Sequence, residues 1–527
     1  MTPTVGYQSA APWMSSSDNR RNRCARNAGP CLAMKSSIRG LEFSRTCGFL
    51  FKATVRAIDV ERNIRKHLRI VQSRGFGTMD CRYVIGRMHA LVLVGVALFP
   101  FSAFGQGNAP EKKAVDDCHV GSYRLSDGTE VDIGNADDGK LRWRRKDGTT
   151  GALTRSPDGS WRSTLGWTDR ADGVGVSFAD CGKGTITFAG VAGRKLEFDV
   201  TQTRFKGAGV TLAGRLTMPR GSGRVPIVVL VHGSEHSSAL DYYSLQRQFA
   251  SEGIGVFAYD KRGTGASEGR YSQDYLVLAT DAIAAMREAK RLAGPRAGRA
   301  GYQGGSQGGW VAPLAARIEP VDFVIVGFGL AISPLQEDRE AIEFDIERHG
   351  YGAAERVKAM EIADASAAIL LSNFREGYAQ LEAVKKKYSG EPWFKHVHGN
   401  VTFYLLGTPE QEVREQGPLL LAGVPMQYDP MPVLQNLDVP QLWILGEQDT
   451  DAPLEETKRR LSQLQSEGRP ITLVTYPDAD HGIYEFEADK DGKRVSTRNP
   501  DGYFRMMRDF IIDGRLKSKY GTARFVD

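Results

Sequence analysis

The sequence predicts a doubly wound, mostly parallel α/β sheet with a helical cap insertion, preceded by a small all-β domain. After residue 204, continuous apolar runs alternate with helical segments, which is typical of a parallel sheet covered by helices on both faces. Before that point, short alternating runs are separated by Asp-Gly pairs, which favour hairpin turns. The 527 residues are 41% hydrophobic and 25% charged, which excludes a wholly disordered or fibrous chain. This length has room for roughly two or three domains.

The positive charge of the chain is concentrated at its N-terminus. The full sequence has 69 Lys and Arg against 63 Asp and Glu, but residues 1–87 alone contain 16 basic and 5 acidic residues. The remainder is therefore slightly acidic, and we expect no nucleic-acid partner. We interpret residues 1–87 as a non-native or disordered basic extension, with Met88 as the true start. A short hydrophobic anchor behind a basic arm is the alternative interpretation.

A short apolar run follows this extension. Residues 90–101 are apolar, and Ala103 and Gly105 place small residues at the two positions that a signal peptidase reads. The run is well short of the ~20 residues that a membrane-spanning helix needs. We therefore expect a signal peptide at 88–105, no stable membrane span, and a periplasmic or secreted protein that begins near Gln106.

Export would leave two cysteines, Cys118 and Cys181, in the mature chain. In an oxidising compartment, this pair predicts one disulfide bond that ties the first strand of the β domain to a late one. Two buried free thiols are the alternative. The nine histidines show no metal-ligand spacing, so we expect neither a metal nor a cofactor.

The β domain is predicted at residues 106–203 from its turn signals. Asp-Gly pairs recur at 127–128, 138–139, 147–148, 158–159 and 172–173. Glycine readily takes the positive φ that such turns require. We expect a compact antiparallel sheet or small barrel, whose core or sheet face contains Trp143, Trp161 and Trp167.

The second domain, at residues 204–527, contains a series of buried strands. The apolar runs are 226–232, 255–260, 299–304, 322–327, 441–446 and 471–476, with helical patterns at 276–292 and 308–317. Residues 333–438 intervene between two of these strands and contain helical stretches. An insertion of this length at the carboxyl edge of a sheet is a candidate cap over a pocket.

The strongest chemical signal is Gly304-Gly-Ser-Gln-Gly308. It matches G-x-S-x-G and falls between a short strand and a helix, the context that this motif requires. Glycines two positions before and after Ser306 keep side chains from colliding across the sharp turn. The hydroxyl then stands exposed at a helix N-terminus, where the helix dipole favours developing negative charge. Ser306 is the candidate nucleophile.

A serine nucleophile needs a base, and the base needs a carboxylate that orients it. His481 follows the last parallel strand, while the other histidines of this domain precede Ser306 or lie in the cap. Asp449 follows the preceding strand, and we prefer it to its neighbour Asp451, which we expect to be a solvated turn or cap residue. The chain order Ser306, Asp449, His481 is the order expected of α/β-hydrolases.

An oxyanion hole needs two backbone N–H donors that point at one place. We expect one from Gln307, directly after the nucleophile, and one from Ser234, in the loop after the strand that ends near Val231. Glu235 lies beside this loop. Because an inward carboxylate would disfavour an anionic transition state, we expect Glu235 to face solvent, or else to receive a substrate amine.

These segments resemble those of secreted bacterial α/β-hydrolases of the serine esterase and serine aminopeptidase-like group. The matching segments are 228–234, 259–267, 304–309, 446–453 and 480–482. They span about residues 205–515 and are specific for the superfamily but not for a substrate. The resemblance implies that residues 260–265 form a structural turn rather than a phosphate-binding loop.

We therefore predict a carboxylic ester hydrolase that acts on a small molecule. One alternative is an aminopeptidase or dipeptidyl-peptidase that cleaves amides of short peptides, with Glu235, Glu337, Asp338 or Glu343 binding the substrate amine. A thioesterase or acyltransferase with the same triad is another. A binding protein with an inactive site is the alternative from a different class. The sequence specifies neither the natural substrate nor the oligomeric state.

Overall fold

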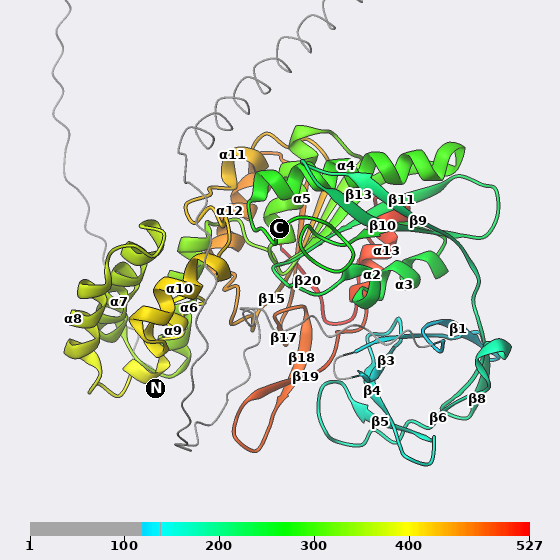
Figure 1. Ribbon diagram of the computed structural model, residues 1–527, viewed down its shortest axis with the longest axis horizontal. Helices are drawn as coiled ribbons and strands as arrows, with labels where there is room; N and C mark the ends of the chain where they lie inside the picture. Colours follow the sequence, from blue (N-terminus) through cyan, green and yellow to red (C-terminus); the bar gives the residue numbers. More distant parts are fainter. Residues whose placement is uncertain (1–117, 137–138, 527) are drawn as a thin grey trace, which may run out of the picture. The chain divides into compact units, whose positions relative to one another are not determined.

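A nine-stranded sheet forms the centre of the larger domain in this computed structural model, which describes residues 118–136 and 139–526 (Figure 1). Its strand order is β20-β16-β15-β14-β13-β11-β12-β10-β9. The strands from β16 to β12 in this order are parallel, and β10, β9 and β20 add antiparallel edges. The predicted doubly wound, mostly parallel sheet is confirmed. The parallel strands are β11 (Val225–Val231), β12 (Gly255–Tyr259), β13 (Ala297–Gly305), β14 (Phe323–Gly327), β15 (Gln441–Gly446) and β16 (Ile471–Tyr476).

Strand β11 shows why helices must cover both faces of this sheet. Ile227 and Val229 pack into one apolar cluster, and the alternate residues Val228 and Leu230 pack into another, all of them fully buried. Helices α4 (Tyr275–Ala293), α5 (Gly308–Ile318) and α12 (Glu455–Ser466) contribute to the first cluster. Helices α3 (Leu245–Ser251) and α13 (Tyr503–Asp513) contribute to the second. An apolar strand with two covered faces is the expected pattern for a parallel sheet.

The smaller domain is a closed antiparallel barrel, one of the two forms that the sequence predicts. Its strands are β1 (Gly121–Leu125), β2 (Glu130–Asn135), β3 (Leu141–Arg144), β4 (Thr150–Arg155), β5 (Trp161–Leu165), β6 (Val176–Phe178), β7 (Thr185–Phe188) and β8 (Val191–Lys195). Pairing of β1 with β8 closes the barrel. Trp143 is buried in its core, whereas Trp167 is 39% exposed.

The boundary between the two domains lies earlier than residue 204. The barrel ends with β8, and β9 (Phe198–Lys206) pairs along its whole length with β10 (Thr211–Pro219) in the nine-stranded sheet. Most of β9 is exposed or only partly buried. A polar edge strand of this kind has no apolar run. The domain boundary predicted from the sequence, at residue 204, therefore lies inside β9 instead of before it.

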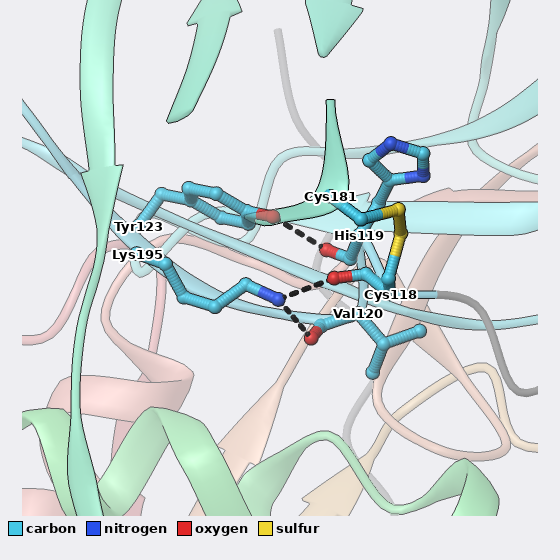
Figure 2. The surroundings of a disulfide bond; sticks show 6 residues. All are labelled: Cys118, His119, Val120, Tyr123, Cys181 and Lys195. Carbon is cyan, nitrogen blue, oxygen red and sulfur yellow. Dashed lines mark hydrogen bonds between the residues drawn. A yellow bond between two sulfur atoms is a disulfide. The ribbon is translucent and has the colours of Figure 1, made fainter. Parts of the chain in front are cut away.

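The disulfide bond joins Cys118, just before β1, to Cys181 in the short turn η2 (Cys181–Lys183) (Figure 2). Lys195 at the end of β8 donates hydrogen bonds from Nζ to the carbonyl oxygens of Cys118 (2.6 Å) and Val120 (2.8 Å). The entry to the barrel is thus held to two later segments, one by a covalent bond and one by hydrogen bonds.

The cap lies between β14 and β15 and is helical, as predicted. It contains α6 (Pro334–Arg348), α7 (Ala353–Leu371), α8 (Tyr378–Tyr388), η4 (Phe394–His396), α9 (Thr402–Gly407), α10 (Glu410–Leu420) and α11 (Met431–Leu434). Phe374, Tyr378 and Trp393 are buried in an apolar cluster that belongs to the cap itself. These aromatic residues therefore form part of the core of the cap.

A short hairpin that the sequence did not predict joins the larger domain to the barrel. It follows β17 (Ala479–Asp480) and consists of β18 (Tyr484–Ala488) and β19 (Arg494–Arg498). The amide of Trp167 donates to the Ser496 carbonyl (2.9 Å), and the amide of Asn499 donates to the Gly148 carbonyl (3.0 Å). The described residues all belong to one compact unit of the chain.

The predicted basic extension (1–87) and signal peptide (88–105) lie outside the described residues. Within the described part of the chain, no helix is both long and apolar enough to cross a membrane.

We expect Gly148→Ala to weaken the contact between the barrel and the hairpin. A Cβ at Gly148 would lie 2.0 Å from the backbone oxygen of Asn499, and the φ of Gly148 is +89°. Gly159→Ala is a matched control, because Gly159 has a φ of +83° in the same kind of turn with nothing within 4 Å of a Cβ. The control should cost about 1 kcal/mol through backbone strain. Gly148→Ala should cost about 1–3 kcal/mol more through the forced contact.

Urea titration of both variants measures this difference in the free energy of unfolding. Equal destabilisation of the two variants would show that the contact between Gly148 and Asn499 contributes nothing to stability.

Candidate active site

The turn between β13 and α5 exposes Ser306 in a strained conformation. Ser306 has a φ of +51°, in the left-handed region that side chains disfavour. A Cβ at Gly304 would lie 2.5 Å from the Gly308 carbonyl oxygen, and a Cβ at Gly308 would lie 2.9 Å from the Val231 carbonyl oxygen. Neither position has room for a side chain. The Ser306 amide donates to the Gly327 carbonyl (3.1 Å), which anchors the turn to the neighbouring strand.

Three predicted residues from three strand ends meet at this turn. Ser306 follows β13, Asp449 follows β15 and His481 follows β16. The Nε2 atom of His481 lies 3.2 Å from Ser306 Oγ, and its Nδ1 atom lies 2.9 Å from Asp449 Oδ2. Because parallel strands end at one edge of a sheet, residues far apart in the sequence come together there.

Asp449, and not Asp451, contacts the imidazole. The Asp449 side chain is only 2% exposed. Its Oδ1 atom accepts hydrogen bonds from the amides of Asp451 (3.0 Å) and Ala452 (2.8 Å), which fix the carboxylate in place. On the other side of the ring, Asp480 Oδ1 accepts from the His481 amide (2.9 Å) and so braces the loop that carries the imidazole.

The amides of Ser234 and Gln307 are the candidate oxyanion donors. Neither donates a hydrogen bond to another described residue. Lys261 Nζ donates to the Gly233 carbonyl (2.8 Å), and Tyr271 donates through its hydroxyl to the Ser234 carbonyl. In a trans peptide the N–H points opposite to the preceding C=O. Lys261 therefore keeps the Ser234 N–H turned away from itself and available to another acceptor.

Two cavities meet at Ser306. One has a volume of about 330 Å³ and is lined by barrel residues, including Arg144, as well as by Ser306. The other, of about 60 Å³, lies on the cap side and is lined by Ser306, Gln307, His481 and cap residues. A carbonyl carbon beside Ser306 Oγ would thus have space on either side for its two substituents.

Comparison with protein families finds a match to the model described as the alpha/beta hydrolase family, over residues 228–492. This match covers half of the sequence and all three of the residues that meet at the turn. The chain belongs to the alpha/beta hydrolase family.

Solved structures that this hydrolase resembles include an esterase of Pyrococcus furiosus, with 18% identity and a TM-score of 0.36, over 54% of this chain and 84% of that one. The acylaminoacyl peptidase of Pyrococcus horikoshii has 16% identity and a TM-score of 0.37, over 74% of this chain and 57% of that one. Est1E of Butyrivibrio proteoclasticus, solved with ferulic acid, has 15% identity and a TM-score of 0.34, over 59% and 96%. A comparison with curated proteins finds no match.

A network of charged and polar side chains lies beside the loop that carries Ser234. Glu235 lies with Oε1 3.0 Å from His232 Nδ1 and accepts a hydrogen bond from the Tyr243 hydroxyl. Burial opposes the charge of Glu235, but His232, Lys261 and Tyr243 outweigh it and hold its pKa well below the usual range. Burial lowers the pKa of Lys261 to about 8. The Glu235 side chain is 33% exposed, but its carboxylate also contacts His232 and Tyr243, so it does not face solvent alone as the sequence suggested.

The three acids of the cap that the sequence singled out lie in different surroundings. Glu337 lines the cap-side cavity with Ser306 and His481. Asp338 is buried within the cap and accepts hydrogen bonds from the amides of Val401 and Thr402. Glu343 is exposed on α6. Only Glu337 is therefore in a position to contact a substrate.

Two carboxyl groups, those of Glu337 and Asp451, line the cap-side cavity together with the His481 imidazole. Burial raises the pKa of Glu337 well above its usual range, and burial raises the pKa of Asp451 to about 6. Asp451 is thus a half-buried cavity residue and not the solvated turn residue that the sequence suggested. Burial also works against a charged His481, but Asp449, Asp451 and Glu337 outweigh it and raise the pKa of the imidazole above its ordinary value.

The possible metal ligands of the described residues do not indicate a metal site. One group of His, Cys, Asp or Glu side chains there lies close enough to share an ion, namely Cys118, His119 and Cys181. Both sulfur atoms of this group are in the disulfide bond and are not thiolate ligands.

The sequence did not indicate the contribution of the barrel to the site. Arg144, Arg145 and Trp167 line the larger cavity together with Ser306, although more than 130 residues separate them along the chain. One local signal could have indicated that Trp167 is not a core residue. Trp167 lies in a turn after a strand and a Gly, and polar residues follow it, whereas a core tryptophan usually lies within a strand or helix.

The acid limb of the pH–rate profile should show how strongly Asp449, Asp451 and Glu337 raise the pKa of His481. A general base must be neutral, so kcat/KM should fall as the pH drops through the raised pKa of His481. We expect the midpoint to lie above the value of about 6.5 for an ordinary histidine. Glu337→Gln removes a carboxyl group whose ionised form stabilises the imidazolium and should move the midpoint down by up to about one pH unit.

Glu343→Gln is the control, because it removes the same charge from an exposed position on the same helix. The profile of kcat/KM against pH is measured for the wild type and both variants. An identical acid limb in Glu337→Gln and Glu343→Gln would show that Glu337 does not interact with the base.

Proposed function

We propose that this hydrolase cleaves a small carboxylic ester through an acyl-enzyme on Ser306. The observation that supports the proposal is the unbroken chain of contacts from Ser306 Oγ to His481 (3.2 Å) and from His481 to Asp449 (2.9 Å). The two unused amides of Ser234 and Gln307 beside it suit the negative oxygen of a tetrahedral intermediate.

In the proposed reaction, Ser306 Oγ attacks the acyl carbon while His481 Nε2 accepts the hydroxyl proton. The bond from the acyl carbon to the alcohol oxygen then breaks, and His481 returns the proton to the leaving alcohol. A water molecule, deprotonated by His481, cleaves the acyl-enzyme to release the acid and restore Ser306. Asp449 remains ionised throughout; it orients the ring and stabilises the imidazolium.

Amide cleavage is the second candidate, and Glu337 is the observation that favours it. Its carboxyl group lies in the cap-side cavity beside Asp451, within the site of the nucleophile. An acid in that position suits the α-amine of an aminoacyl substrate, as in an aminopeptidase or dipeptidyl-peptidase. Thioester hydrolysis and acyl transfer share the same acyl-enzyme step and differ only in the leaving group or acceptor.

We also propose a periplasmic or secreted location for the protein. The disulfide bond between Cys118 and Cys181 supports an oxidising compartment. Fractionation of cells tests this location, and recovery of the protein only from the cytoplasm would refute it. N-terminal sequencing of the exported protein tests the start at Met88, and a mature N-terminus upstream of Met88 would show that residues 1–87 belong to the protein.

A fluorophosphonate probe and a 4-nitrophenyl butyrate assay test the proposed reaction. We expect the probe to label the wild type, and Ser306→Ala to abolish labelling and reduce kcat by about 10⁴-fold or more. Ser466→Ala is the control, since Ser466 is exposed on α12. The same assay with aminoacyl anilides separates ester from amide cleavage. Labelling that survives in Ser306→Ala would refute the assignment of the nucleophile.

A further inference from the structure

An arginine of the barrel lies at the larger cavity with part of its guanidinium buried and unpaired. Arg144 is the last residue of β3 and lines the 330 Å³ cavity that reaches Ser306. Its Nη1 atom is buried and has no hydrogen-bond partner among the described residues. Burial lowers the pKa of Arg144, which reflects the cost of removing its charge from water. Buried polar groups are nearly always paired, so an unpaired guanidinium needs an explanation.

The carboxylate opposite Arg144 in the barrel is already engaged. Asp132 on β2 is the register partner of Arg144. Its two oxygen atoms accept hydrogen bonds from Nε (2.8 Å) and Nη2 (2.7 Å) of Arg247, on α3. Ser122 donates a third hydrogen bond to Oδ1 (2.7 Å). The hydrogen bonds of Asp132 therefore go to Arg247 and Ser122, and Nη1 of Arg144 has no hydrogen-bond partner among the described residues.

The remaining charged groups on the cavity wall do not neutralise Arg144. Glu235 is held by His232 and Tyr243 and lies in the field of Lys261. The other charged residue among the described lining residues is Arg145, which adds a second positive charge. An anion that entered this cavity would thus find a guanidinium whose hydrogen bonds are unused.

A second, basic cavity adjoins the first. It has a volume of about 660 Å³, and Arg144, Trp167 and Tyr242 line both cavities. Its other cationic lining residues are Lys140, Arg142, Arg155 and Arg162, against the single acid Asp169 among the described residues. Lys140, Arg155 and Arg162 are exposed. Clustered charges of one sign raise the local concentration of oppositely charged ligands and speed their association.

We propose that the substrate of this hydrolase carries an anionic oxyacid group, a carboxylate or a phosphate, which Arg144 binds in the cavity between the barrel and Ser306. The proposal rests on the proposed function, because it assigns a substrate class to the same site. The planar guanidinium offers paired N–H groups that match two oxygen atoms of such an anion. A cavity of about 330 Å³ suits a small-molecule substituent. The barrel then determines specificity, while the larger domain performs the chemistry.

Matched ester pairs that differ only in charge test the proposal in the full-length protein. One pair has its charge on the acyl side: 4-nitrophenyl hydrogen adipate and its neutral methyl ester. The other has it on the leaving group: 4-carboxyphenyl butyrate and its neutral methyl ester. We expect the wild type to prefer the anionic member of at least one pair by 10-fold or more in kcat/KM. Arg144→Gln should abolish that preference, so that the ratio of anionic to neutral kcat/KM falls to about one.

Arg194→Gln is the control for general charge effects. Arg194 is exposed on β8 of the same barrel and does not line the larger cavity. It should keep the full preference for the anionic ester. The same ratio of anionic to neutral kcat/KM in the wild type and Arg144→Gln would overturn the proposal. If Arg144→Gln does not fold, Arg144→Met replaces it, because methionine is a flexible side chain that carries neither the charge nor the N–H donors. A ratio equal to the wild type in Arg144→Met would also overturn the proposal.

Protection of Ser306 from a neutral fluorophosphonate separates this inference from the proposed function, because it needs no ester cleavage. Adipate and inorganic phosphate are tested separately, so that the two anions are distinguished. We expect at least one of them to slow labelling of the wild type and not of Arg144→Gln. Anion protection without ester hydrolysis would refute the proposed function and retain the anion site. Ester hydrolysis with neither protection nor preference would retain the function and refute the anion site.

Discussion

The reversal of the chain at Ser306 is the constraint on which the rest of the site depends. Its positive φ is tolerated because Gly304 and Gly308 let β13, α5 and the end of β11 approach to distances that no side chain would permit. That approach brings the loop after β11 beside the first turn of α5. The candidate oxyanion amides of Ser234 and Gln307, which belong to different strand–helix connections, can then face the same oxygen atom. A larger residue at either glycine would force these two connections apart.

Acidic and basic side chains lie on opposite sides of Ser306. Glu337 and Asp451 line the small cavity on the cap side, whereas Arg144 and Arg145 line the larger cavity on the barrel side. The charge of Glu235, the neighbour of Ser234, is offset by His232 and Lys261. A substrate with an anionic group at one end would gain from one orientation and lose from the other. Electrostatics of this kind act on orientation and specificity more than on the chemical step.

Much of the larger domain could be predicted from the sequence because its signals are local. A buried parallel strand is a continuous apolar run, and the turn at Ser306 needs glycines at fixed spacing, so both are visible in a few residues. The polar edge strand β9 and the hairpin of β18 and β19 were missed because neither has an apolar run. The direction of the Glu235 side chain also could not be predicted, since it depends on Tyr243, whose position relative to the loop is set by packing.

The part played by the barrel could not be predicted for a different reason. The contact of Gly148 with Asn499 and the ion pair of Asp132 with Arg247 join segments that are far apart in the sequence, and no local pattern records such pairs. These contacts also explain how a second domain can take part in binding. A group on a flexibly attached domain would spend much of its time away from the nucleophile, whereas a binding residue on a rigid strand is held near one position. Arg144 lies on β3 between the Asp132–Arg247 pair on one side and the Gly148–Asn499 contact on the other. The contacts that fix the barrel therefore also fix the strand that carries Arg144 to the cavity lined by Ser306.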